Sequence, residues 1–309
     1  YQYFLLNILI CPRCTLLIRY IPNGMSLSIS SSMMGRRRSV TDLDKTIFYS
    51  DEINDDFGKK HIRYDPYKGK KKIVVERRGF YDHVSNFFFA IIYFLVKTFS
   101  IIVGVKWIGK ENVNKLDNKK GYFIYANHAG ELDVALAYLI SHKQRTNTIG
   151  YSEAIANPAT KLIVPICGFI PLPVDIHDIP KMTHAISYYI QEKKQVIVIY
   201  PEAHLWPNYT GVRNFKRQSF RYPVELDAPV LPVFFARRKR KGFWKVFKKP
   251  RVTVIIGEPL YPDKDLNRRD AIQKLGDDTY ESLVKLSKTI EQEDYWHYVY
   301  MPKNEENID

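Results

Sequence analysis

The chain has 309 residues, of which 45% are hydrophobic and 14% aromatic, and a formal net charge of +14. This composition predicts a globular core, in one large α/β domain or two smaller ones. Three cysteines, Cys11, Cys14 and Cys167, are too few to form a disulfide framework and suit a reducing compartment. Cys11 and Cys14 form a CxxC pair without a second ligand pair nearby, so we predict no metal site.

The first 78 residues carry few signals of regular structure. The apolar opening lacks the basic lead of a signal peptide, so residues before Met25, or before Met33 and Met34, are interpreted as a mis-called start or a variable extension. Residues 35–78 are polar and densely charged. We therefore predict that residues 1–78 form a variable, weakly ordered extension.

The next stretch is apolar almost throughout, from "NFFFAIIYFLVKTFSIIVGVKW" at residues 86–107. Its length is near the roughly 20 residues of a spanning helix, but Lys97 at its centre costs about 2.5–3.5 kcal/mol on insertion. An interfacial helix lets Lys97 reach the headgroups, with Arg77, Arg78 and Trp107 as anchors. We predict a membrane-associating segment at 79–107; a full crossing and a buried core helix are the alternatives.

From Gly121 onward, short β-rich runs alternate with helical patterns, which is typical of βαβ units and a parallel sheet. We predict one α/β domain over 108–309, with a mainly parallel mixed sheet covered by helices and preceded by the apolar membrane-associated helix. The predicted strands are "YFIYA", "GFIPLPV", "QVIVIY", "PVLPVFF" and "RVTVIIG". The predicted helices lie near 131–142, 152–167, 179–193 and 217–226, with a final helix from about 268 towards 293.

A polar stretch, "NHAGELD", follows the first of these strands and contains His128 and Asp133. On one continuous helix, the two side chains would point roughly 140° apart and could not meet. A turn through Asn127 and Gly130 removes this obstacle, because Gly130 supplies a permissive backbone before the helix. Asp133 then accepts one imidazole N–H of His128 and leaves the other nitrogen free as a base. The stretch contains no Ser or Cys, so if the site is catalytic, the proton that His128 removes belongs to a substrate hydroxyl; the alternative is a polar residue at the end of a strand with no catalytic role.

Four blocks in order give this stretch a family resemblance. "NHAGELD" resembles the NHxxxxD block of the PlsC-type glycerolipid acyltransferases, and later blocks of that family resemble "CGFIPLPVD", "YPEAHLWPNYTGVRNFKRQSF" and "APVLPVFF". "VIIGEPLYP" resembles the family's closing strand, so the resemblance covers roughly residues 80–262. It implies that His128 is the general base on the acceptor hydroxyl and that Asp133 orients it.

The resemblance also implies a substrate site in the third block. Glu202 occupies the position of the glutamate in the family's "PEGTR", whereas Ala203, His204 and Leu205 replace its Gly, Thr and Arg. The arginine that usually ends the second block is also absent. We expect Glu202 and His204 to contact the acceptor. A phosphate on that acceptor would be held by cationic side chains that follow in the sequence. These side chains are Arg213, Lys216 and Arg217.

Residues 236–251, "ARRKRKGFWKVFKKPR", are strongly basic, contain no acid and include Phe243, Trp244 and Phe247. Basic and aromatic residues together suit single-stranded nucleic acid or an anionic bilayer. The apolar segment at 86–107 favours the bilayer, and a solvated hairpin face is the remaining alternative. We expect membrane lipids as partners and no nucleic acid.

These observations predict a membrane-associated acyltransferase at the cytoplasmic face. It would move a fatty acyl group from acyl-CoA or acyl carrier protein to a lysophosphatidate-like hydroxyl in phospholipid biosynthesis, without a cofactor. The alternatives are an acyltransferase with an acceptor that lacks phosphate, or a non-catalytic lipid- or nucleic-acid-binding protein on the same fold. A metal-dependent hydrolase is disfavoured, because no cluster of His and carboxylate residues completes a coordination sphere around His128.

Overall fold

A computed structural model describes residues 45–58, 65–67, 75–141, 144–152, 163–247 and 249–302. The chain divides into two units, Tyr1–Asp42 and Leu43–Asp309. The first unit lies outside the described residues, and so do our predictions for Cys11, Cys14 and the start of the chain. All structural statements below concern the second unit.

The second unit is built on a seven-stranded sheet with the order β2-β8-β7-β3-β6-β4-β5. Every neighbouring pair is parallel except β7 and β8, which form an antiparallel hairpin. This is the predicted mainly parallel mixed sheet. Its strands are β2 (Lys106–Ile108), β3 (Tyr122–Ala126), β4 (Thr146–Gly150), β5 (Phe169–Pro171), β6 (Val196–Ile199), β7 (Val230–Arg238) and β8 (Arg251–Ile256).

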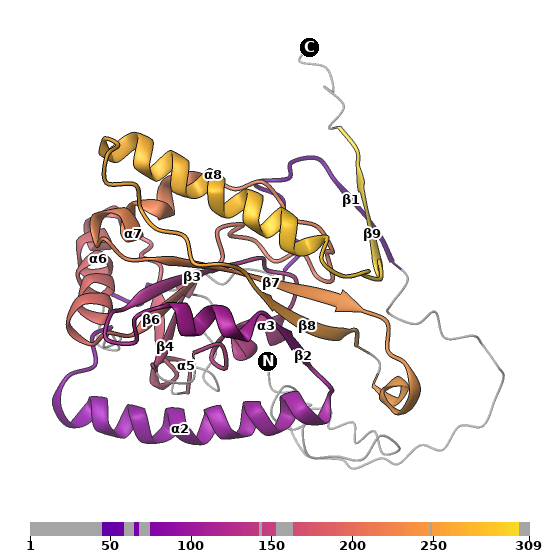
Figure 1. Ribbon diagram of the computed structural model, residues 1–309, viewed down its shortest axis with the longest axis horizontal. Helices are drawn as coiled ribbons and strands as arrows, with labels where there is room; N and C mark the ends of the chain where they lie inside the picture. Colours follow the sequence, from indigo (N-terminus) through magenta and orange to yellow (C-terminus); the bar gives the residue numbers. More distant parts are fainter. Residues whose placement is uncertain are drawn as a thin grey trace, which may run out of the picture. The chain divides into compact units, whose positions relative to one another are not determined.

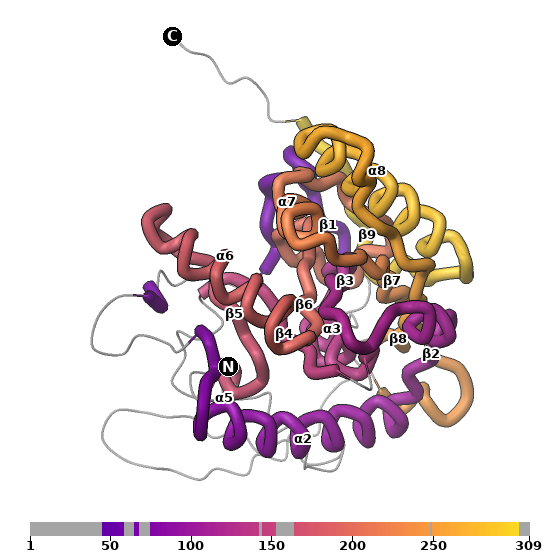
Figure 2. The backbone as a smooth tube through the Cα atoms, turned by 60° about the vertical axis from the view of Figure 1, so that its left-hand side comes forward, coloured from indigo at the N-terminus to yellow at the C-terminus, as the bar shows by residue number. Residues whose placement is uncertain are grey.

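Helices cover the sheet because its central strands are apolar on both faces. Every residue of β3 is buried; Phe123 and Tyr125 belong to one core cluster, and Tyr122, Ile124 and Ala126 to another. In both views, α2 lies along one side of the sheet and α8 along the other (Figures 1 and 2). The helices are α2 (Gly79–Ile102), α3 (Glu131–Ala137), α5 (Ile163–Ile166), α6 (Ile179–Ser187), α7 (Arg221–Glu225) and α8 (Arg268–Ser287).

The predicted elements match with shifted ends. The helix predicted near 131–142 ends at Ala137, and the helix predicted towards 293 ends at Ser287. Of the helix predicted near 152–167, only α5 lies within the described residues. Strand β4 was not predicted, because its sequence "TNTIG" is largely polar. It is buried all the same, since Asn147 accepts a hydrogen bond from Arg77 and donates one to Gln195 at 2.9 Å.

Helix α2 spans Gly79–Ile102, within the segment 79–107 that was predicted to associate with a membrane. Gly104, at φ +72, turns the chain into β2, and a side chain there would collide with the Trp244 ring. One face of α2 packs on the domain: Ser85 donates to the Ile166 carbonyl at 2.9 Å. The opposite face is apolar and exposed, and α2 is long and apolar enough to cross a membrane.

Residues 45–58 differ from the weak order expected of the first 78 residues. Lys45–Tyr49 forms β1, which pairs in parallel with β9 (Trp296–Tyr300) in a separate two-stranded sheet. The buried Trp206 ring holds this segment, with centroids 4.8 Å from Tyr49 and 5.1 Å from Phe57. Its indole N–H donates to the Asp55 carbonyl at 2.8 Å. The segment is ordered because aromatic rings from distant parts of the chain bury it.

Candidate active site

The predicted turn between β3 and α3 is present. Asn127 follows β3 and accepts a hydrogen bond from the Phe235 backbone N–H at 2.7 Å, which ties the turn to β7. The Ala129 N–H donates to the Asp133 carboxylate at 3.0 Å and closes the turn onto the first turn of α3. Gly130 has an extended backbone, with φ −177, that any residue adopts. It leaves space instead, because a side chain there would meet the guanidinium of Arg237.

Asp133 is fully buried and binds Arg237, a partner that the sequence did not indicate. Arg237 Nη2 lies 2.7 Å from Oδ1 and 2.6 Å from Oδ2 of Asp133. His128 Nδ1 is buried without a hydrogen-bond partner in the described part of the chain. The predicted hydrogen bond from His128 to Asp133 is thus not formed, because a cationic guanidinium is a stronger partner for a carboxylate than a neutral imidazole. Burial raises the pKa of Asp133, and Arg237 opposes this effect.

The imidazole of His128 is uncharged at neutral pH. Burial, followed by the charges of Arg213 and Arg237, lowers its pKa from 6.5 to about 4. The ring packs against Tyr200 with centroids 4.6 Å apart. A neutral imidazole has a lone pair that can accept the proton of a hydroxyl group. The environment of His128 therefore supplies the base form, although it disfavours the imidazolium that proton transfer creates.

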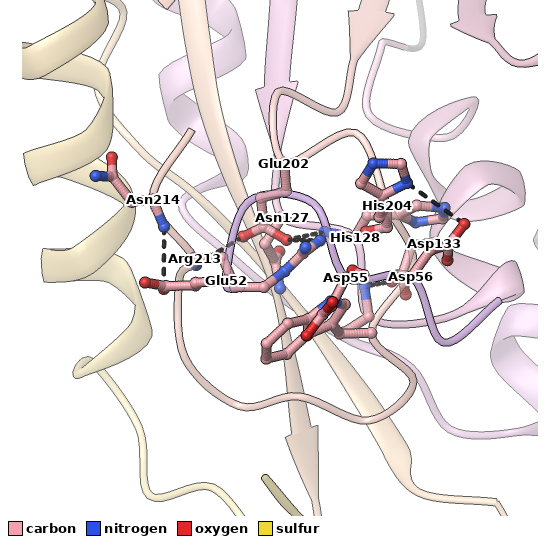
Figure 3. Close-up of polar contacts among 12 residues, drawn as sticks. Glu52, Asp55, Asp56, Asn127, His128, Asp133, Glu202, His204, Arg213 and Asn214 are labelled. Carbon is pink, nitrogen blue, oxygen red and sulfur yellow. Dashed lines mark hydrogen bonds and ion pairs between the residues drawn. The ribbon is translucent and has the colours of Figure 1, made fainter. Parts of the chain in front are cut away.

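The loop after β6 meets the turn after β3, because both loops lie at the carboxyl ends of parallel strands that pair with each other. Glu202 Oε2 accepts the His128 backbone N–H at 3.2 Å (Figure 3). The Asn208 N–H donates to the Ala129 carbonyl at 2.8 Å. Ala203 occupies the left-handed region at φ +63, where a glycine would be relaxed. The turn after β3 and the loop after β6 are thus held together by hydrogen bonds and border the same candidate site.

Two of the three cationic residues expected to bind a phosphate have carboxylate partners. Arg213 is fully buried beneath Glu202, with its Nη2 3.1 Å from Glu202 Oε2 (Figure 3). Arg217 Nε donates to Asp277 of α8 at 2.9 Å. Lys216 is exposed. Arg213 and Arg217 thus have carboxylate partners, and their expected contact with a phosphate stays a prediction.

His204 faces the segment that precedes α2. Its Nδ1 lies 3.4 Å from Asp56 Oδ2, and its ring stacks on Tyr151 with centroids 5.9 Å apart. The charge of Asp56 also acts on His128, whose pKa it raises against the larger effect of burial. Asp56 and Arg237 were both missed from the sequence. For Arg237, the available signal was the pair Arg237 and Arg238, which follows the apolar run of β7.

The described residues show no group of three or more His, Cys, Asp or Glu side chains placed to hold a metal ion. Burial raises the pKa of the Cys167 thiol to about 11, so this thiol is protonated at neutral pH.

Comparisons with known proteins agree with this arrangement. A family model described as Acyltransferase matches residues 104–236, which include His128, Asp133, Glu202 and Arg213. Among solved structures, the 1-acyl-sn-glycerophosphate (LPA) acyltransferase PlsC from Thermotoga maritima is similar in fold, with 16% identity and a TM-score of 0.50. The alignment covers 68% of this chain and 84% of that chain. No curated protein matches the sequence. Residues 104–236 therefore match the acyltransferase family model, and the chain shares its fold with PlsC.

Proposed function

We propose that the protein transfers a fatty acyl group from acyl-CoA or acyl carrier protein to the hydroxyl of a lysophospholipid, at the cytoplasmic face of a membrane. The observation that carries this proposal is His128, a neutral imidazole at the end of β3 whose backbone N–H is held by Glu202. The solved relative supports the choice of acceptor, since its name describes an enzyme that acts on 1-acyl-sn-glycerophosphate.

In the proposed reaction, His128 accepts the proton of the acceptor hydroxyl as the hydroxyl oxygen attacks the thioester carbonyl. The tetrahedral centre then collapses, the C–S bond breaks, and the thiolate leaves and takes up the proton. The imidazolium that forms in between needs a counter-charge. Asp133 supplies it if its carboxylate binds the imidazolium while it stays bound to Arg237, since one carboxylate can accept several hydrogen bonds.

The partners of the cationic side chains bear on whether the acceptor headgroup carries a phosphate. Arg213 binds Glu202 and Arg217 binds Asp277, so each of these two guanidinium groups already has a carboxylate partner that would compete with a phosphate. This observation favours a second candidate, an acceptor hydroxyl without a phosphate, such as that of a monoacylglycerol.

The test uses purified protein in detergent or vesicles with labelled acyl-CoA and acyl carrier protein. Each donor is offered with lysophosphatidate and with monoacylglycerol. His128→Ala should reduce the turnover about 10²- to 10⁴-fold, because the reaction loses its base. Asp133→Asn should also reduce it strongly. His177→Ala, which alters an imidazole with an 85% exposed side chain, is the matched control. Near-normal turnover of folded His128→Ala would contradict the mechanism.

Helix α2 supports the membrane part of the proposal. Its outer face exposes Phe87 at 65%, Phe94 at 67% and Ile101 at 68%, a surface that is costly in water and favourable in a bilayer interface. The basic turn between β7 and β8 lies at the end of this helix and would face the headgroups.

A further inference from the structure

A cavity of about 550 Å³ lies at the outer end of the β7–β8 hairpin, beside the start of β2 and the segment after α8. It is separate from the groups assigned to acyl transfer. Its cationic lining residues are Lys106, Arg238, Lys239, Lys241 and Arg251.

The lining of this cavity has more positive than negative charge. Two acids, Glu291 and Glu293, also line it, and Glu293 pairs with Lys239 at 3.0 Å. Arg238 on β7 and Arg251 on β8 are direct register partners. Like charges opposite each other destabilise a strand pair, so this arrangement favours an anion between or beside them.

Arg238 supplies hydrogen-bond donors without acceptors. Its Nε and Nη2 are buried and have no hydrogen-bond partner in the described part of the chain. Arg251, in contrast, donates to the Gly104 carbonyl and lies over the Trp244 ring, 4.4 Å from its centroid. A guanidinium with two unpaired N–H groups matches the oxygens of a phosphate group, which accept hydrogen bonds in the same fork geometry.

The neighbourhood of the cavity indicates which phosphate is in reach. The turn after β7 packs on the end of α2, because Arg240 Nη1 donates to the Val103 carbonyl at 2.9 Å and Trp244 Nε1 to the Ile102 carbonyl at 3.2 Å. Figure 1 shows this turn, in orange, beside the end of α2. Phe243 is 79% exposed on the turn, and Ile102 is 55% exposed on the helix. Exposed apolar side chains on this turn and on the end of α2 suit the level of lipid headgroups, so a lipid phosphate is the phosphate within reach of the neighbouring cavity.

We propose that this cavity binds the phosphate headgroup of an anionic membrane lipid. The site adds a saturable contact to the general attraction between a basic hairpin and an anionic surface. It does not depend on acyl transfer, so it is tested by binding in the absence of any thioester, and its failure would leave the proposed reaction untouched.

The test compares two pairs of substitutions in the full chain. Lys106→Gln with Lys241→Gln removes two exposed cations that line the cavity, and Lys245→Gln with Lys249→Gln removes two exposed cations that do not. Both pairs lower the net charge equally, so general electrostatic attraction predicts equal effects. Binding is measured by sedimentation with phosphatidylcholine vesicles that contain or lack phosphatidate.

The proposal predicts that the cavity pair weakens binding to phosphatidate vesicles at least tenfold more than the control pair, with no such difference on phosphatidylcholine alone. Arg238→Gln, checked for folding by thermal unfolding, should weaken the same binding at least tenfold. Equal losses in the two pairs would overturn the proposal. The phosphate could also come from the coenzyme A part of the acyl donor. Adenosine 3′,5′-bisphosphate, which carries phosphates of that part, tests this second source. The lipid assignment would be overturned if Lys106→Gln with Lys241→Gln abolished binding of this nucleotide and left vesicle binding unchanged. The cavity would then belong to the acyl donor.

Discussion

Replacing His128 with Gln should make the folded state more resistant to acid. The pKa of His128 is lowered from 6.5 to about 4 by burial and by two arginines, so the unfolded chain binds a proton at this residue in a pH range where the folded protein does not. Above pH 6.5 the titration of His128 therefore leaves the free energy of unfolding unchanged. As the pH falls from 6.5 towards 4, the free energy of unfolding decreases, because only the unfolded chain takes up the proton. Gln cannot titrate, so the variant lacks this loss.

The magnitude follows from the two pKa values. A site that titrates at 6.5 when unfolded and at about 4 when folded costs the wild-type protein about 2.5 kcal/mol of unfolding free energy between pH 8 and pH 4.5. For a domain of this size, that loss corresponds to a fall of about 5–10 °C in Tm. Other groups titrate over the same range in both proteins, so the difference between the two pH profiles isolates His128.

The assay is thermal unfolding of the wild type and the variant from pH 8 to pH 4.5, in the same detergent. The gap between the two Tm values should change by about 5–10 °C in favour of the variant as the pH falls. Activity gives a second measure, since the acid limb of kcat/KM for the wild type should lie near pH 4. Parallel Tm profiles, or an acid limb near pH 6.5, would refute the account of His128 as a buried neutral base.

Three further changes test other parts of the structure. Arg237→Gln leaves the Asp133 carboxylate without its cation and should lower the free energy of unfolding, measured by chemical denaturation, by about 3–5 kcal/mol. The loss should be larger at neutral than at acid pH, because the pKa of Asp133 rises further. Asp133→Asn in the same chain should restore part of the loss, and additive losses would contradict the pairing. Ala203→Gly should raise the unfolding free energy by about 1 kcal/mol, because it relieves the left-handed backbone at φ +63, and a fall would argue against strain there. Phe87→Ser with Phe94→Ser should weaken vesicle binding about tenfold or more with little change in Tm, since both rings are exposed; unchanged binding would mean that α2 is not the membrane contact.

Much of the fold was determined by sequence alone. The continuous apolar runs at β3, β6, β7 and β8 predicted strands buried on both faces, and all four are present. The turn through Asn127 and Gly130 was also predictable, because His128 follows a strand and a helical pattern begins three residues later. Backbone placement of this kind depends on local pattern, which a sequence shows directly.

The partners of the charged side chains were decided only by the tertiary structure. Arg237 lies 104 residues after Asp133, and it reaches the carboxylate because β7 pairs with β3 in one particular register. Arg213 turns inward to Glu202, so a cation that looked free in the sequence became part of a buried ion pair. The segment 45–58 is ordered by Trp206, about 150 residues away along the chain. The local sequence pattern shows on which strand, turn or helix a residue lies. Its partner depends on which distant charges and rings the fold brings near it, because buried carboxylates and guanidinium groups require pairing.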